Sequence, residues 1–86
     1  MASIQDVVNA AYRIQECTKE LQRRTLSCAD LLKTHSDRLL QTVRGSRSGE
    51  EAVERVREAE RSTRESAAQL LRLETIVTGF IRDISK

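Results

Sequence analysis

Apolar and small side chains recur at alternating spacings of three and four residues along almost all of this 86-residue chain. In the first half these positions are Ile4, Val7, Ala11, Ile14, Thr18, Leu21, Thr25, Cys28, Leu32, His35, Leu39 and Thr42. In the second half they are Ala52, Val56, Ala59, Thr63, Ser66, Leu70, Leu73, Val77, Phe80 and Ile84. The spacing is that of an amphipathic α-helix with a coiled-coil seam, and not the period of two that marks a strand.

One short segment separates the two runs. It holds two of the three glycines of the chain, Gly45 and Gly49, together with two serines, whereas the chain has no proline. Glycine and serine clustered between periodic runs indicate a turn. We therefore predict an all-α, single-domain fold, with one helix over about 4–43, a turn over 44–48 and a second helix over about 49–84, packed antiparallel as a coiled-coil-like hairpin.

Residues that favour helix starts precede both runs. Ser3 is followed three residues later by Asp6, which gives the form of a capping box with Asp in place of Glu. Ser48 and Glu51 have the usual capping-box spacing and predict the start of the second helix. Gly79 lies inside the second run, and the apolar residues beyond it favour a helix that continues past it.

The apolar positions form a stripe wider than one helix can cover. A short chain also buries little surface by itself. We therefore expect the hairpin to dock on a protein partner, either another helical hairpin (its own copy or a different chain) or effector helices, and to form a four-helix bundle. The expected partner interface consists of Val8, Ile14, Leu21, Leu31, Leu32, Leu39, Leu40, Val56, Leu70, Leu71, Leu73, Val77, Phe80 and Ile81.

The charge pattern argues against several other classes of function. The formal net charge is +2, and the basic and acidic residues are interspersed, unlike the one-sided charge of a nucleic-acid binder. Asp6, Arg13 and Glu16 interrupt the region where a secretory signal peptide would lie, and no apolar run has the length of a membrane span. We expect a cytoplasmic protein that does not bind nucleic acid.

The residues that usually carry chemistry are few and scattered. His35 is the single histidine, and it shares a face with Cys28 without a group to orient it, so we expect no enzyme activity. No spacing typical of metal ligands is present, and we expect no cofactor and no small-molecule substrate. Cys17 and Cys28 are eleven residues apart, about 16 Å along a helix, which is too far for a disulfide between them. We expect both cysteines to lie in the helix seam, with an intermolecular disulfide as the alternative.

The central turn resembles that of a known family. Val43-Arg44-Gly45 occupies the place of a W-x-G turn between two helices, and Gly49-Glu50-Glu51-Ala52 is similar to the start of the second helix in the WXG (Esx-type) family of type VII secretion. Val43 stands where that family has tryptophan. The family's C-terminal Y-x-x-x-D/E signal is absent, and Phe80-Ile81-Arg82-Asp83 is the nearest substitute, with Phe80 and Asp83 as a candidate targeting signal that is one residue short.

The resemblance implies a non-enzymatic partner or targeting factor. Such a chain would pair with a secreted effector or another small hairpin and leave the cell by the non-classical type VII route. The residues themselves leave two alternatives open. One is a cytosolic coiled-coil adaptor or secretion chaperone, and the other is a nucleic-acid-binding helical hairpin.

Overall fold

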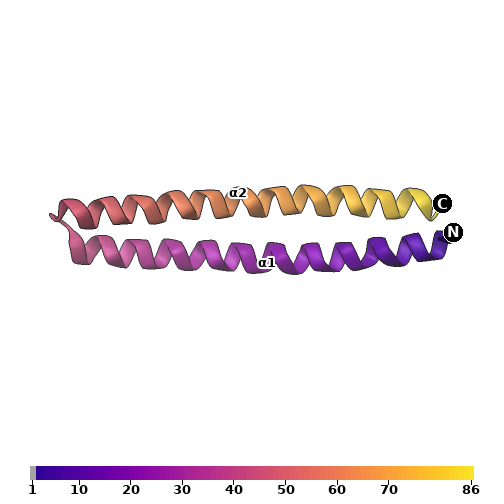
Figure 1. Cartoon of the computed structure of the whole chain (residues 1–86), viewed down its shortest axis with the longest axis horizontal. Coiled ribbons are helices and arrows are strands. Elements are labelled where there is room, and N and C mark those ends of the chain that lie inside the picture. Colours follow the sequence, from indigo (N-terminus) through magenta and orange to yellow (C-terminus); the bar gives the residue numbers. More distant parts are fainter. Residues whose placement is uncertain (1) are drawn as a thin grey trace.

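The computed structural model describes residues 2–86 and consists of two long helices joined by a tight turn (Figure 1). Helix α1 spans Ile4–Val43, and helix α2 spans Arg47–Ile84. The helices run antiparallel, so the first residues of α1 and the last residues of α2 lie together at one end, which we call the open end (Figure 1). The molecule measures 63 × 20 × 14 Å along its principal axes. The all-α hairpin expected from the sequence is confirmed.

Helix α1 begins with the capping box that the sequence predicts. The backbone N–H of Asp6 donates to Ser3 Oγ at 3.1 Å, and the backbone N–H of Ser3 donates to Asp6 Oδ2 at 3.2 Å. Both donors lack a partner within the helix, and the two side chains supply one for each. The acidic Asp6 also lies in the first turn, where it interacts favourably with the helix dipole.

Helix α2 begins two residues earlier than expected, and its cap is Ser46 rather than Ser48. The backbone N–H of Gly49 donates to Ser46 Oγ at 3.3 Å, which makes Ser46 the N-cap residue. Glu50, rather than Glu51, accepts a hydrogen bond from the turn, because the N–H of Gly45 donates to its carboxylate at 3.0 Å. The capping box predicted at Ser48 is therefore wrong.

The conformation of Gly45 explains this earlier start. Its φ of +90° lies in a region that residues with a Cβ rarely adopt, and it reverses the chain within a single residue. The N–H of Ser46 then donates to the carbonyl of Val43 at 2.9 Å and closes the turn. A reversal this tight places Ser46, and not Ser48, at the first position from which a side chain can cap α2.

The seam between the helices consists of the buried and half-buried residues that face the other helix. In α1 these are Val8, Ala11, Gln15, Thr18, Gln22, Thr25, Ala29, Leu32, Ser36, Leu39 and Val43. In α2 they are Val53, Val56, Glu60, Thr63, Ala67, Leu70, Glu74, Val77, Ile81 and Ile84. Ala29 is completely buried, and Val53 and Ala67 are 2 % exposed.

The observed seam agrees with the predicted one at every second position and differs by one residue at the others. Ala11, Thr18 and Leu70 face the other helix as expected, whereas Ile14 and Phe80 are exposed and Gln15 and Ile81 take their places. The sequence pattern selects the larger apolar side chains, but two helices approach most closely through small ones. The hairpin therefore brings Ala29, Ser36 and Ala67 to its closest contacts. It leaves Ile14, Leu73 and Phe80 outside.

The two cysteines and the histidine, which were expected in the seam, also lie outside it. Cys17 and Cys28 are free and exposed, and His35 is exposed. All three lie on the stripes that flank the seam, so the expectation that the cysteines are buried is wrong. For Cys28 and His35 the reason is the shift of the seam by one residue. Ala29 and Ser36 occupy the seam positions that were predicted for them.

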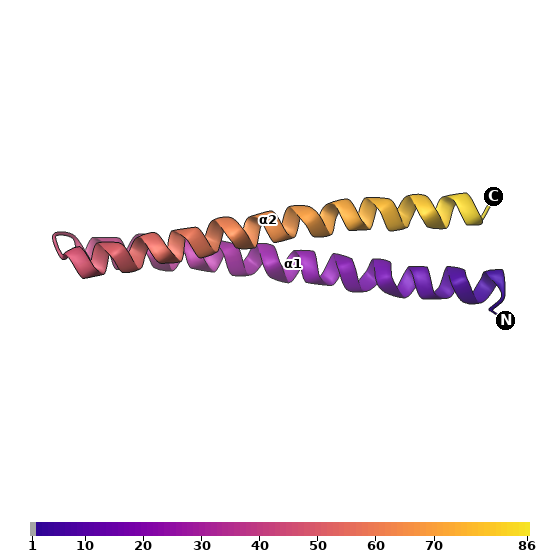
Figure 2. The ribbon, with the colours of Figure 1, turned by 45° about the horizontal axis from the view of Figure 1, so that its top comes forward.

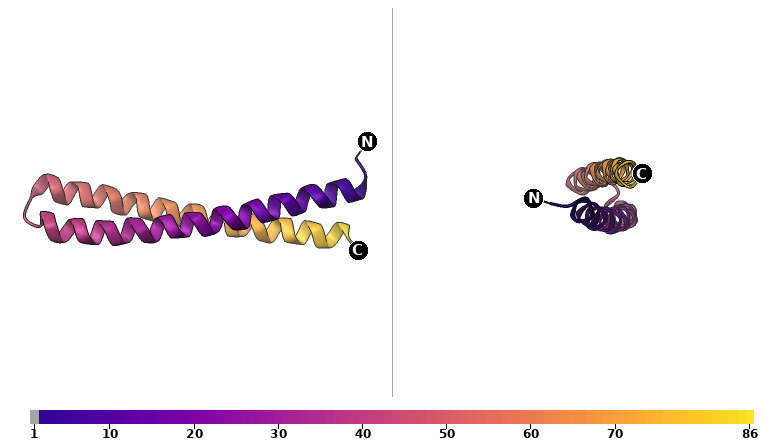
Figure 3. Two further views of the ribbon diagram at one scale, coloured as in Figure 1. Left: turned by 90° about the horizontal axis from the view of Figure 1, so that it is seen from below. Right: turned by 90° about the vertical axis from the view of Figure 1, so that its right-hand side faces the viewer.

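The hairpin is far from globular. Its helices separate towards the open end in one view and cross in another (Figures 2 and 3). The radius of gyration is 19.2 Å, against about 12 Å for a compact domain of this length. The accessible surface is 6471 Å², against about 5,200 Å² for a compact monomer of 9.8 kDa. The shape thus leaves more than 1,000 Å² of additional surface in contact with water.

Candidate functional site

The largest apolar side chains of the molecule lie on its outside. Within residues 2–86, five hydrophobic residues are buried and three of these are alanine, whereas eleven large hydrophobic residues are exposed. Many of the exposed ones gather on one side of the hairpin near the open end. We define the apolar face as Val7, Ala10, Ile14, Cys17 and Leu21 of α1 with Leu73, Ile76 and Phe80 of α2.

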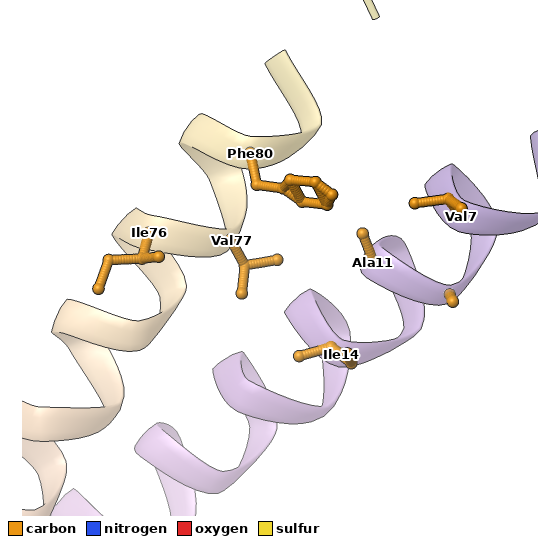
Figure 4. A pocket seen from close by; sticks show the side chains of 7 residues that line it. Val7, Ala11, Ile14, Ile76, Val77 and Phe80 are labelled. Atoms are coloured by element: carbon orange, nitrogen blue, oxygen red, sulfur yellow. The ribbon is translucent and has the colours of Figure 1, made fainter. Parts of the chain in front are cut away.

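A groove of about 380 Å³ opens between the helices at the centre of this face. Its lining residues are Val7, Ala10, Ala11, Ile14, Ile76, Val77 and Phe80. The ring of Phe80 extends from α2 towards Val7 and Ala11 of α1 (Figure 4). All of these side chains are apolar, so the groove offers a surface for apolar groups and contains no polar side chain to orient a small polar ligand.

The groove exists because small residues of α1 face large residues of α2. Ala10 and Ala11 are adjacent and reach little beyond the helix backbone, and Ala11 is 6 % exposed. Opposite them stand Val77, half-buried, and Phe80, which is 43 % exposed. Because the helices also diverge here, the Phe80 ring only partly fills the space (Figures 2 and 4). An apolar side chain from another molecule would complete this packing.

The apolar face belongs to two exposed stripes that follow the helices. The α1 stripe consists of Ser3, Val7, Ala10, Ile14, Cys17, Leu21, Arg24, Cys28, Leu31, His35 and Arg38, and the α2 stripe of Arg55, Ala59, Ser62, Ser66, Gln69, Leu73, Ile76, Phe80 and Asp83. The α1 stripe has no charged residue from Ser3 to Leu21, and the α2 stripe has none from Ala59 to Phe80. Nearer the turn the same stripes carry three exposed arginines, which are Arg24, Arg38 and Arg55. The charged residues of these two stripes therefore lie towards the turn, except for Asp83 at the open end of α2.

The opposite flank of the hairpin carries ion pairs between the helices. Arg64 Nη2 lies 3.0 Å from Asp30 Oδ1, and Arg57 Nη2 lies 3.9 Å from Asp37 Oδ1. Hydrogen bonds to Glu60 and then to Asp30 raise the pKa of the Arg64 guanidinium above its ordinary value. This flank includes exposed leucines, but charged groups separate them, and it is the better hydrated of the two.

The fourteen residues predicted for the partner interface fall into three classes. The exposed ones are Ile14, Leu21, Leu31, Leu71, Leu73 and Phe80. The half-buried ones are Val8, Leu32, Leu39, Leu40, Val56, Leu70 and Val77. Ile81 is 7 % exposed and packs within the hairpin, so it is not available to a partner. Ile14, Val77 and Phe80 are brought together in the groove, whereas Leu71 lies on the opposite flank.

Four groove residues are missing from that predicted set: the seam residue Ala11 and three others. Val7, Ala10 and Ile76 line the groove, and Val7 and Ile76 are 38 % and 68 % exposed. Val7, Ile14 and Leu21 are spaced by seven, as are Leu73 and Phe80. A spacing of seven on the flank of a seam marks a second contact stripe in coiled coils, and it would have identified Val7.

The candidate turn motif has a structural role in the hairpin. Val43 is half-buried and its side chain packs directly over the backbone of Gly49. Arg44 is exposed, and Gly45 has the positive φ that reverses the chain. The two candidate targeting residues have different surroundings. Phe80 lines the groove, whereas the exposed Asp83 forms an ion pair with Lys86, whose Nζ lies 3.8 Å from its carboxylate.

Other kinds of site find no support in the part of the chain that the structure describes. Among residues 2–86, His, Cys, Asp and Glu form no group of three or more that is placed to hold a metal ion. Neither helix has, over these residues, a stretch long and apolar enough to cross a bilayer.

Comparison with models of protein families, with curated proteins and with solved structures finds no match to this chain.

Proposed function

We propose that this protein is a non-enzymatic interaction hairpin that pairs with another helical hairpin, or with effector helices, to form a helical bundle. One observation carries the proposal: the hairpin packs its small residues inside and leaves a continuous face of large apolar residues exposed. A protein that acted as an isolated hairpin would be expected to bury Ile14, Leu73 and Phe80, because these side chains stabilise most when they leave water.

The magnitudes favour a partner. Complete burial of a large apolar side chain contributes roughly 1.5–3 kcal/mol, whereas an alanine in the seam contributes much less. Most of the apolar stabilisation available to this sequence therefore lies outside the hairpin. Clusters of exposed apolar side chains at this density mark protein interaction sites.

The finer form of the proposal follows from the turn. A chain whose Val43-Arg44-Gly45 turn and Gly49–Ala52 helix start resemble those of the WXG family would pair with a secreted effector and bring it to a type VII machine. The position of the turn supports this form, because it lies midway along the chain and at the end opposite the apolar face. The assembly expected from this form is a four-helix bundle.

Site-specific photo-crosslinking in the native host tests the proposal. A photoreactive residue at Leu73 should give a discrete product with a helical protein or with a second copy of the chain. The same residue at Leu71 is the control, because two residues turn a helix by about 200° and place Leu71 on the opposite flank. A product of equal yield from both sites, or from neither, would contradict the proposal.

The finer form requires a second measurement. If the crosslinked partner is exported, deletion of this hairpin should reduce the amount of that partner in the medium while its amount inside the cell is maintained or raised. If the amount of partner in the medium does not change, the role in type VII secretion is contradicted. The proposal that the hairpin forms a bundle with that partner would still stand.

A further inference from the structure

We infer that the occupant of the apolar face is a second copy of this chain, placed antiparallel so that only the open-end halves of the two hairpins overlap. This inference rests on the proposed function, since it names the partner and the register of the proposed bundle. In this dimer the two apolar faces cover each other about a two-fold axis, and the turns project in opposite directions.

The distribution of charge along the stripes selects this register. In a fully overlapped antiparallel dimer, Arg24, Arg38 and Arg55 of one copy would lie against the apolar face of the other. Arg24 Nε is 2.8 Å from Glu20, and Arg55 Nη1 is 3.3 Å from Glu58, so both ion pairs would lose water on contact with that face. Burying exposed ion pairs against apolar side chains costs several kcal/mol and forms no new hydrogen bonds.

A parallel dimer has a different fault. It would match the apolar faces to each other, but it would also place the three arginines of one copy next to the same three arginines of the other. The half-overlapped antiparallel arrangement keeps all six guanidinium groups in water. It also matches each apolar face with the α1 stripe over Ser3 to Leu21, where that stripe has no charged residue.

The area of the apolar face is large enough for a specific dimer of moderate affinity. The stretch of the α1 stripe without charged residues runs from Ser3 to Leu21, eighteen positions apart, which gives about 27 Å of length. With a molecular width of 20 Å, each copy contributes roughly 500–600 Å², for a total of about 1,100 Å². Specific interfaces begin at about 1,000 Å², so the dimer is expected to be specific with a dissociation constant in the micromolar range.

The groove supplies the shape that a self-complementary contact needs. A two-fold axis through the face brings the exposed Phe80 and Ile14 side chains of one copy to the groove of the other. Each groove, of about 380 Å³, can accept one large apolar side chain. A two-fold axis forms both contacts at once, because the same patch is used on both copies.

The exposed cysteines allow a direct measurement of the register. With Cys17→Ser, the chain carries one thiol, Cys28, which is exposed and lies beyond the apolar face towards the turn. A spin label on Cys28 of each copy should give a distance of roughly 40–50 Å in the half-overlapped dimer. Full antiparallel overlap or a parallel dimer would place the labels about 20 Å apart or closer.

The experiment is pulsed dipolar spectroscopy on the full chain at a few hundred micromolar. A distance of 40–50 Å supports the inference. A distance near 20 Å overturns the register, and the absence of dipolar coupling overturns the second copy as the occupant. Neither negative result removes the proposed function, because a crosslink from Leu73 to a different protein would still support it.

Two matched variants test the face in sedimentation equilibrium. Leu73→Glu should weaken dimerisation by at least tenfold, because it places a carboxylate in the apolar contact, whereas Leu71→Glu on the opposite flank should leave the dissociation constant within about twofold of the unmodified chain. Circular dichroism must show equal helix content for both variants. Equal weakening by both would overturn the assignment of the face.

Discussion

Two glycines shape the turn, and each has a different physical reason. Gly45 has a φ of +90°, which costs little only when there is no Cβ. Gly49 has an ordinary helical conformation, but a Cβ there would overlap the side chain of Val43. The turn thus needs one glycine for the backbone and one for space, and neither requires a bound ligand.

Substitution of Gly45 is expected to destabilise the hairpin through the backbone alone. Gly45→Ala should lower the free energy of unfolding by about 1–2 kcal/mol, because a residue with a Cβ is strained at positive φ. Gly45→Asn should cost less, because asparagine adopts positive φ more readily than other residues. Urea denaturation followed by circular dichroism measures both, and an alanine variant as stable as the unmodified chain would contradict the turn conformation.

Substitution of Gly49 is expected to act through Val43. Gly49→Ala should destabilise the hairpin because the new methyl group collides with the Val43 side chain. Val43→Gly in the same chain should remove the collision and recover part of the loss, whereas Val43→Ala would keep the Cβ that collides. The double-mutant cycle measured by urea denaturation should therefore show a coupling energy of about 0.5–3 kcal/mol. Additive effects would mean that the two residues do not touch.

Glu20 gives the hairpin a dependence on pH. Hydrogen bonds from Arg23 and then Arg24 lower the pKa of the Glu20 carboxyl below its ordinary value. A carboxyl with a lowered folded-state pKa stabilises the fold above its unfolded-state pKa, about 4.3, and this stabilisation is lost as the pH falls through the folded-state value. Glu20→Gln should therefore melt below the unmodified chain at pH 7, and the two should converge near pH 2.

At the scale of the elements, the seam works by close approach rather than by large side chains. Ala29 of α1 is 0 % exposed, and Ala67 of α2 is 2 % exposed. Larger residues such as Leu32 and Leu70 lie in the same seam but stay half-buried. Close contact through alanine lets the two backbones pack without voids. Alanine side chains are small, however, so this packing buries little apolar surface.

Enlarging the seam is expected to force the helices apart. Ala29→Leu should lower the free energy of unfolding by about 1–3 kcal/mol, because the added carbons have no space between the helices. Ala68→Leu is the matched control on the exposed surface of α2, where the two residues have similar helix propensity. If thermal or urea unfolding shows the same change for both, Ala29 is not at a close contact.

The helices were predictable from local patterns, whereas the rotation of the seam was not. Ser3 and the uninterrupted spacing of three and four determine where α1 begins and how far it continues. The face that packs inside the hairpin depends on a competition between two adjacent stripes. Hydrophobicity favours Ile14 and Phe80, and close approach favours Ala29 and Ala67. The sequence contains both stripes, and only the packing of one helix on the other selects between them.

The candidate site was predictable in part for the same reason. Ile14, Leu73 and Phe80 were expected to contact a partner from their size alone. The groove was not expected, because it depends on the divergence of the helices beside two consecutive alanines. Leu32 and Leu70 are unsuitable positions for a test of docking, because both belong to the seam and an aspartate there would destabilise the hairpin itself.

At the scale of the whole molecule, the shape provides a test of assembly. One hairpin is 63 Å long, and the half-overlapped dimer should have a maximum dimension of roughly 90–100 Å. A fully overlapped bundle would remain near the length of one hairpin. Small-angle X-ray scattering over a concentration series should therefore show both mass and length rising together. A doubled mass at constant length would contradict the half-overlapped register.

The antiparallel layout also has a practical consequence for attaching other domains to the chain. Both chain ends lie at the open end, beside the groove, while the turn lies at the other end of a 63 Å rod (Figure 1). A fluorescent protein or affinity tag fused to either terminus would stand next to the apolar face and compete with whatever binds there. A dye attached to a substituted Arg44, which is exposed, would instead be held at the far tip without a break in the turn. A reporter meant to follow assembly therefore belongs in the turn.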